Sequence, residues 1–244
     1  MLRLQKIMAD AGLCSRRQAE VRIGDGEVRV NGRIAVLGQK ADPLLDRISV
    51  GGNLIQTGGN RLEKTQKTTL LLNKPKGFIC SRTDPHHDQT IYNLVPRKFR
   101  KFRLFSAGRL DKNTEGLIIL TNDGDLANSL THPSNSVRKI YHVILGHEIE
   151  ASILPKLVQG RELEGEFLRF DKVRPISRKT DALKKLEIHL GHGKKREIRR
   201  LLESFGHKIK KLRRIQIGGL KIKGMPLGAI KELNEKEINL LFAT

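Results

Sequence analysis

The stretch that most constrains this chain is residues 106–125, where a polar loop runs directly into a short apolar segment. Residues 117–120 are short, β-branched at the centre and followed by turn residues at 122–124, a pattern typical of a buried strand. Asp111 lies in the loop just before this strand. Most aspartates beside Gly and Asn are turn or cap residues, whereas a carboxylate at a strand–loop junction of a basic protein also suits a nucleophile. The residues alone leave both interpretations open.

Charge is the strongest global property of the chain. Its 244 residues carry a formal net charge of +21 and a pI near 10.3. This indicates a polyanionic partner, nucleic acid before membrane, because no apolar run approaches the length of a spanning helix. Cys14 and Cys80 lie far apart without metal-type spacing, and the first residues lack the apolar region of a signal peptide. We therefore expect a reduced, cytoplasmic protein with no membrane contact.

The first sixty residues predict two helices and two hairpins. Apolar residues recur at helical spacing over 4–11, and Ser15 with Gln18 forms a capping box that opens a second helix. The dipeptides Asn-Gly at 31–32 and Gly-Gly at 51–52 suit tight hairpin turns. Residues 56–67 have almost no apolar content and contain two glycines, so they predict an interdomain linker.

Three further segments of the chain predict regular structure. Asp125 is the expected N-cap of a helix through Leu130. Tyr141 alternates with apolar residues over 137–145, which turns its ring inward, where a structural tyrosine is the usual interpretation. Residues 197–205 predict an amphipathic helix, and the window 192–223 holds twelve Lys and Arg against two Glu, a local charge of +10.

Four motifs occur in order along the chain. They are KPKG at 74–77, GRLD-x-x-T-x-GL at 108–117, KIY at 139–141 and KREIRR at 195–200. Together they resemble the pseudouridine synthases that act on single uridines of bacterial ribosomal RNA. The segment before them resembles the small RNA-binding domain named after ribosomal protein S-four.

This resemblance implies an α+β protein. We expect an S-four-like RNA-binding domain over residues 1–60, a linker over 61–67, and a pseudouridine synthase catalytic domain over 68–244. The catalytic domain should contain a mixed, mostly antiparallel β-sheet.

The resemblance also implies the reaction, an isomerisation of uridine to pseudouridine at a specific site. Asp111 would be the nucleophile, Arg199 would pair with it, and Tyr141 would stack on the flipped-out uracil. Arg109 would enter the space that the flipped uridine leaves. The reaction oxidises nothing and transfers nothing but a proton, so we expect no cofactor and no metal. The sequence contains no P-loop, complete dinucleotide loop or zinc-type spacing.

The basic residues at these motifs are the expected RNA-binding residues, and for each one a solvated surface position is the alternative. They are Arg16, Arg17, Arg29, Arg33, Arg109, Lys195, Arg196 and Arg200. Asn31 belongs to the same expected face of the first domain. The partner would be ribosomal RNA or an assembling ribosomal subunit, bound by a monomer.

Residues 4–6, 74–85 and 196–201 resemble the family members that act on the large subunit more than those that act on the small subunit. This resemblance favours the 23S (large-subunit) RNA. The same reaction on 16S RNA is the first alternative. A non-catalytic rRNA-binding or ribosome-assembly protein is an alternative from another class, for which the charge and the front domain would suffice.

Overall fold

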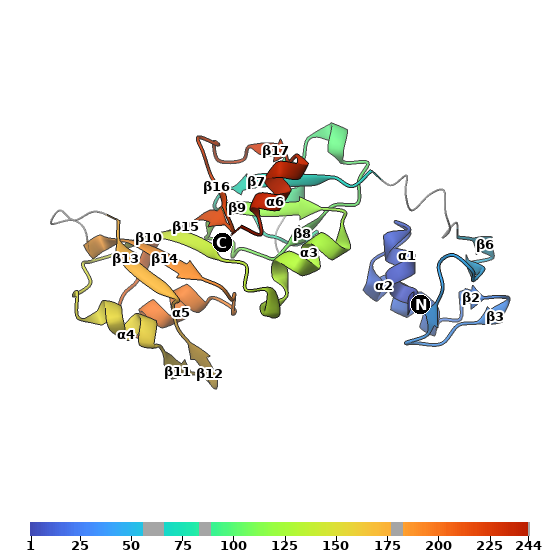
Figure 1. Cartoon of the computed structure of the whole chain (residues 1–244), viewed down its shortest axis with the longest axis horizontal. Coiled ribbons are helices and arrows are strands. Elements are labelled where there is room, and N and C mark those ends of the chain that lie inside the picture. The colour runs from blue at the N-terminus through green and yellow to red at the C-terminus, as the bar shows by residue number, and fades with distance from the viewer. Residues whose placement is uncertain (56–65, 83–88, 177–182, 244) are drawn as a thin grey trace. The chain divides into compact units, whose positions relative to one another are not determined.

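The computed structural model describes residues 1–55, 66–82, 89–176 and 183–243. The chain divides into two compact units, Met1–Lys67 and Thr68–Thr244 (Figure 1). The predicted linker at 61–67 lies outside the described residues, apart from Gln66 and Lys67.

The first unit packs two helices against small antiparallel sheets. Helices α1 (Leu4–Asp10) and α2 (Arg16–Gly24) share one apolar core with the strands. The larger sheet has the order β3 (Arg33–Ile34), β2 (Val28–Val30), β5 (Ile48–Val50) and β6 (Asn53–Leu54), and β1 (Leu2–Arg3) pairs with β4 (Lys40–Ala41).

The local predictions for this unit are confirmed. Ser15 and Gln18 form the capping box of α2. Asn31 and Gly32 turn between β2 and β3 with φ of 52° and 82°, the left-handed values that a two-residue hairpin turn requires.

The second unit is built on one nine-stranded sheet. Its main path has the order β13 (Lys172–Pro175), β14 (Lys185–Leu190), β10 (Lys139–Leu145), β15 (Ile209–Ile217), β9 (Glu115–Thr121), β7 (Thr69–Lys74) and β17 (Ile230–Glu232). Strand β8 (Phe105–Ala107) pairs with β9, and β16 (Leu220–Lys221) pairs with β15. Every pair in this sheet is antiparallel except β9 with β15, so the predicted mixed, mostly antiparallel sheet and the α+β class are confirmed.

Helices cover the sheet and complete three apolar clusters. Helices α4 (Ile153–Gln159) and α5 (Glu197–Glu203) pack on β10, β14 and β15. Helices α3 (Gly124–Thr131) and α6 (Glu235–Leu240) pack on one face of β7 and β9. Three short 3-10 helices, Ile91–Leu94, Arg97–Phe99 and Pro133–Asn135, and the hairpin of β11 (Arg161–Leu163) and β12 (Glu166–Leu168) complete the unit.

Strand β9 is buried on both faces, as its continuous apolar run predicted. Leu117 and Ile119 belong to the cluster with α3, whereas Ile118 and Leu120 face the cluster that contains residues 91–104. The predicted cap of α3 is wrong by two positions. Asp123 accepts the hydrogen bonds from the backbone nitrogens of residues 125 and 126, while Asp125 itself lies in the first turn.

The parallel contact between β9 and β15 joins the two halves of the sheet. It consists of two residue pairs, Glu115 with Arg213 and Gly116 with Arg214. Gly116 has a φ of 109°, and a Cβ atom there would lie 2.1 Å from the backbone oxygen of Arg214. Only glycine permits both this conformation and this approach. The junction places the loop before β9 beside β10 and β15.

Candidate active site

A cavity of about 350 Å³ opens at this junction. Its walls come from the loop before β9, from β10 and β15, and from the segment that leads from β14 into α5. Five of the predicted site residues line it: Arg109, Asp111, Tyr141, Arg196 and Arg199.

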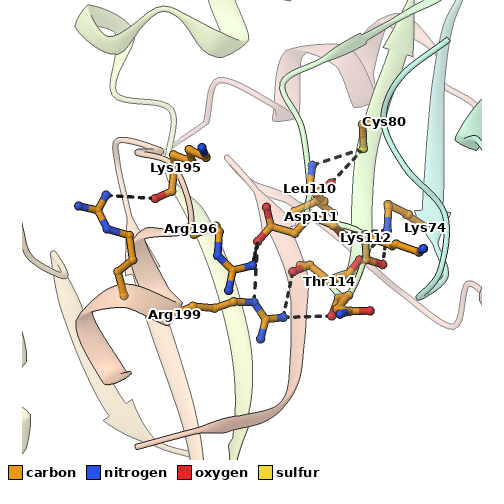
Figure 2. Close-up of polar contacts among 11 residues, drawn as sticks. Lys74, Cys80, Leu110, Asp111, Lys112, Thr114, Lys195, Arg196 and Arg199 are labelled. Carbon is orange, nitrogen blue, oxygen red and sulfur yellow. Dashed lines mark hydrogen bonds and ion pairs between the residues drawn. The ribbon is translucent and has the colours of Figure 1, made fainter. Parts of the chain in front are cut away.

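The loop that carries Asp111 is held from beneath by Lys74, whose side chain is fully buried. Its Nζ donates a hydrogen bond to the backbone oxygen of Pro75 at 3.1 Å. It also donates to the backbone oxygens of Asp111 at 3.1 Å, Lys112 at 3.3 Å and Thr114 at 2.9 Å (Figure 2). Burial lowers the pKa of Lys74, because the charged form loses water. The last residue of β7 therefore fixes the backbone on both sides of Asp111.

Cys80 anchors Leu110, the residue before Asp111 in the same loop. Its Sγ donates to the backbone oxygen of Leu110 at 3.3 Å and accepts from the nitrogen of Leu110 at 3.4 Å. Burial raises the pKa of the Cys80 thiol, which keeps it protonated and able to donate.

The Asp111 carboxylate faces two guanidinium groups. Its Oδ2 lies 3.6 Å from Nη1 of Arg196 and 3.8 Å from Nε of Arg199, and Figure 2 shows the three side chains pointing toward one another. Arg199 also donates through Nη2 to the oxygen of Asn113 at 3.1 Å and to Oγ1 of Thr114 at 3.3 Å. Arg199 therefore holds both the carboxylate and its loop, and burial lowers its pKa from the usual high value.

Arg196 has a position that the sequence did not predict. It was expected to bind RNA, yet it stands just before α5 in a left-handed conformation, with φ of 52°, and reaches Asp111. Its side chain is 46% exposed, so it can still meet a phosphate at the rim of the cavity.

Tyr141 forms part of the opposite wall and is 9% exposed. Arg214 lies directly across from it on β15, with Nη1 3.5 Å from the Tyr141 hydroxyl oxygen and Nε donating to the oxygen of Leu117 at 2.7 Å. Lys139, two residues before Tyr141, also lines the cavity. Burial, together with the charge of Arg214, lowers the pKa of Lys139 to about 8.

Sequence reasoning missed Lys139 and Arg214 as cavity residues. For Lys139 a signal was present, since residues i and i+2 of a strand share a face and Tyr141 was predicted to point inward. For Arg214 no local pattern distinguishes it from the neighbouring cations of the 192–223 window.

Arg200 points away from the cavity. It pairs with Glu166 and, at 3.2 Å, with Glu164, and it donates to the backbone oxygen of Leu163 at 3.0 Å. The β11–β12 hairpin thus occupies this guanidinium, and its role in RNA binding stays a prediction without structural support. Lys195, by contrast, is exposed.

In the first unit, the predicted RNA-facing cations all lie on the surface. They are Arg16, Arg17, Arg29 and Arg33. Asn31 uses its side chain inside the unit, donating to Asp46 at 2.8 Å and accepting from the nitrogen of Arg47 at 2.9 Å. Hydrogen bonds within the unit therefore account for the position of the Asn31 side chain without a contact to RNA.

Two family models match the chain. The model described as RNA pseudouridylate synthase matches residues 68–204, which include the Asp111 loop, Tyr141 and Arg199. The chain belongs to the RNA pseudouridylate synthase family. The model described as S4 domain matches residues 2–43. Family membership makes the protein an isomerase, which confirms the predicted class of enzyme.

Individual relatives match this chain over nearly its whole length. An uncharacterized RNA pseudouridine synthase of Aquifex aeolicus is 37% identical over 243 residues, covering 99% of this chain and 94% of the relative. Ribosomal large subunit pseudouridine synthase B of Bacillus subtilis is 34% identical over 250 residues, covering 100% and 96%. The Pseudomonas aeruginosa protein of the same name is 35% identical, and the chain spans 61% of its length.

One solved structure supports the fold directly. The chain described as "Crystal structure of pseudouridylate synthase" superimposes with a TM-score of 0.69 and 28% identity, covering 99% of this chain and all of the other.

Within the described parts of the chain, no three or more His, Cys, Asp or Glu side chains form a group that could hold a metal ion. No helix in those parts is long and apolar enough to cross a membrane.

Proposed function

We propose that this family member converts a specific uridine of 23S ribosomal RNA to pseudouridine, with Asp111 as the nucleophile and the target base flipped out of its stack. The observation that carries the proposal is the carboxylate of Asp111, held between two guanidinium groups at a cavity that Tyr141 also lines. A cavity of about 350 Å³ suits one nucleoside and excludes a base pair still in its helix.

The reaction needs little beyond these groups. The bond between ribose C1′ and uracil N1 breaks, the base turns, and C5 of the base bonds to C1′. The C5 proton then leaves and N1 takes up a proton, so substrate and product are isomers. An ionised carboxylate at the ribose–base junction initiates this sequence, and Arg196 and Arg199 lie within ion-pair distance of the Asp111 carboxylate. The ring of Tyr141 supplies a flat surface for the uracil.

Base flipping requires a group that fills the vacated space. Arg109 is exposed at the cavity, two residues before Asp111, and is the proposed group. Extruding a base costs a few kcal/mol, which contacts in the cavity and an inserted side chain offset.

The choice of 23S RNA rests on the relatives. Those of Bacillus subtilis and Pseudomonas aeruginosa are named for the large ribosomal subunit and match nearly the whole chain. The exposed arginines of the S4 unit provide phosphate contacts that need no base sequence. We extend the proposal to a cytoplasmic monomer acting on ribosomal RNA or on an assembling subunit.

Release of tritium from RNA labelled at C5 of uridine tests the proposal. Labelled 23S and 16S RNA and assembling particles are offered separately to the wild type and to Asp111→Asn, a substitution that keeps shape and removes charge. We expect release from 23S RNA alone, and none with the variant, which should still bind RNA. Wild-type release by Asp111→Asn would remove Asp111 from the mechanism. Release from 16S RNA alone would reverse the substrate, and binding without release from any substrate would favour the non-catalytic alternative.

A further inference from the structure

Two cations on the β10–β15 wall of the cavity lack an acidic partner among the described residues. No carboxylate lies within ion-pair distance of Lys139 or Arg214 there, whereas Arg196 and Arg199 face Asp111. Arg214 is 5% exposed, and its buried Nη2 makes no hydrogen bond within the described part of the chain. Leaving a buried charged donor without an acceptor is costly, so this nitrogen is suited to an acceptor supplied by a ligand.

The sheet places both cations next to Tyr141. Arg214 is the cross-strand partner of Tyr141, and Lys139 lies two residues earlier on the same face of β10. The cavity therefore has two charged sides: the loop with Asp111 and its two arginines, and the β10–β15 wall with Tyr141 and its two cations. Lys139 and Arg214 therefore lie next to the ring on which the proposed function places the uracil.

We propose that Lys139 and Arg214 bind the carbonyl oxygens of the target uracil and stabilise the negative charge that the base carries while it is detached from ribose. This assignment rests on the proposed function. When the C1′–N1 bond breaks, both electrons stay on the base, giving an anion delocalised over N1, O2 and O4. The charge disappears when C5 forms its bond to C1′. The C5 proton then leaves and N1 takes up a proton, so the base ends neutral and no oxidant or reductant is needed.

The symmetry of uracil explains why one fixed pair of donors suffices. A half-turn about the N3–C6 axis exchanges N1 with C5 and O2 with O4. The two donors therefore meet a carbonyl oxygen in the same place before and after the turn. Because Arg214 is 5% exposed and Lys139 is partly buried, these preorganised charges act more strongly than they would in solution.

The burial of Arg214 distinguishes binding of the uracil from a contact with the RNA phosphates. Arg214 is almost completely enclosed, and the exposed cations that line the cavity are Arg109, Lys194 and Arg196. The exposed group is suited to phosphates, which remain outside when a single base enters. A phosphate contact by Lys139 is the competing outcome in the following experiment.

The test uses single-turnover rates on a 23S RNA fragment that the wild type modifies, carrying either uridine or 5-fluorouridine at the target. Digestion and chromatography measure the loss of each nucleoside. Fluorine at C5 withdraws electrons and stabilises the detached base, so the substituted substrate depends less on the two cations. Lys139→Gln is the main variant, because no hydrogen bond of Lys139 within the described protein is lost. Lys139→Arg keeps the charge. Arg213→Gln is the matched control, since Arg213 lies on the same strand as Arg214 but does not line the cavity.

We expect Lys139→Gln to lower the uridine rate by about 10²-fold or more, with RNA Kd within about threefold of the wild type. The loss on 5-fluorouridine should be several-fold smaller, Lys139→Arg should recover most of the rate, and Arg213→Gln should stay near the wild type. Arg214→Gln should behave like Lys139→Gln if its thermal unfolding is unchanged.

Three results would overturn the assignment. A wild-type rate for Lys139→Gln would exclude any role, and an equal loss on both substrates would exclude charge stabilisation of the base. A weaker Kd with a salt slope reduced by about one would show a phosphate contact instead. The proposed function fails separately, before these variants are compared, if the wild type modifies no uridine in any 23S RNA.

Discussion

Replacing Lys74 with methionine tests how the protein holds the loop that carries Asp111. Methionine has nearly the length of lysine but cannot donate a hydrogen bond, so four backbone oxygens lose the Nζ donor. Two of them keep a backbone donor, because Asp111 accepts from the nitrogen of Thr114 at 3.0 Å and Lys112 accepts from that of Gly77 at 2.9 Å. We therefore count the loss at the other two oxygens only.

A hydrogen bond from a charged donor contributes about 1.5–3 kcal/mol, so two of them contribute roughly 3–6 kcal/mol. Methionine regains part of this free energy, because an uncharged side chain avoids the cost of burying a charge, the same cost that lowers the pKa of Lys74. We expect the free energy of unfolding of the catalytic unit to fall by about 2–4 kcal/mol, which in a unit of this size lowers Tm by roughly 5–15 °C. Because the loop can then shift by a fraction of an ångström, turnover should fall by about 10²-fold.

Thermal unfolding followed by circular dichroism, and single-turnover tritium release at a temperature where the variant is folded, measure the two effects. Lys76→Met is the matched control, because Lys76 is exposed on the same KPKG segment. If Lys74→Met unfolded at the same temperature as Lys76→Met and retained its turnover, the four hydrogen bonds would not be what fixes the Asp111 loop.

Two further substitutions test the sheet junction and the front unit. Gly116→Ala places a methyl group 2.1 Å from a backbone oxygen at a φ of 109°, so we expect more than about 3 kcal/mol of destabilisation or failure to fold, whereas Gly193→Ala, with open space around it, should unfold as the wild type does. Chemical denaturation measures both, and equal midpoints would contradict the close contact. The double variant Arg16→Ala/Arg17→Ala should weaken RNA binding and reduce the slope of log Kd against log salt by about 1–2. Arg22→Ala, which removes a cation already paired with an acid, is the control, and an unchanged slope in the double variant would place RNA elsewhere.

The sequence by itself determined the parts of this protein that depend on near neighbours. The apolar run at 117–120 is long enough only for a strand, and its burial on both faces follows from its lack of polar alternation. The capping box at Ser15 and the Asn31-Gly32 turn formed as predicted, because each is a contact within a few residues. The position of Asp111 at the start of a buried strand belongs to the same class of local information.

The tertiary structure decided which cations serve the site. The chain contains 47 Lys and Arg, and composition or helical spacing does not say which few face the cavity. Arg199 and Arg200 are adjacent in sequence, yet one reaches Asp111 and the other a distant hairpin. Lys74 and Arg214 reach the site only through strand pairing. A slip of one residue in the register would turn each of them to the opposite face, and that register is set by the packing of the whole sheet.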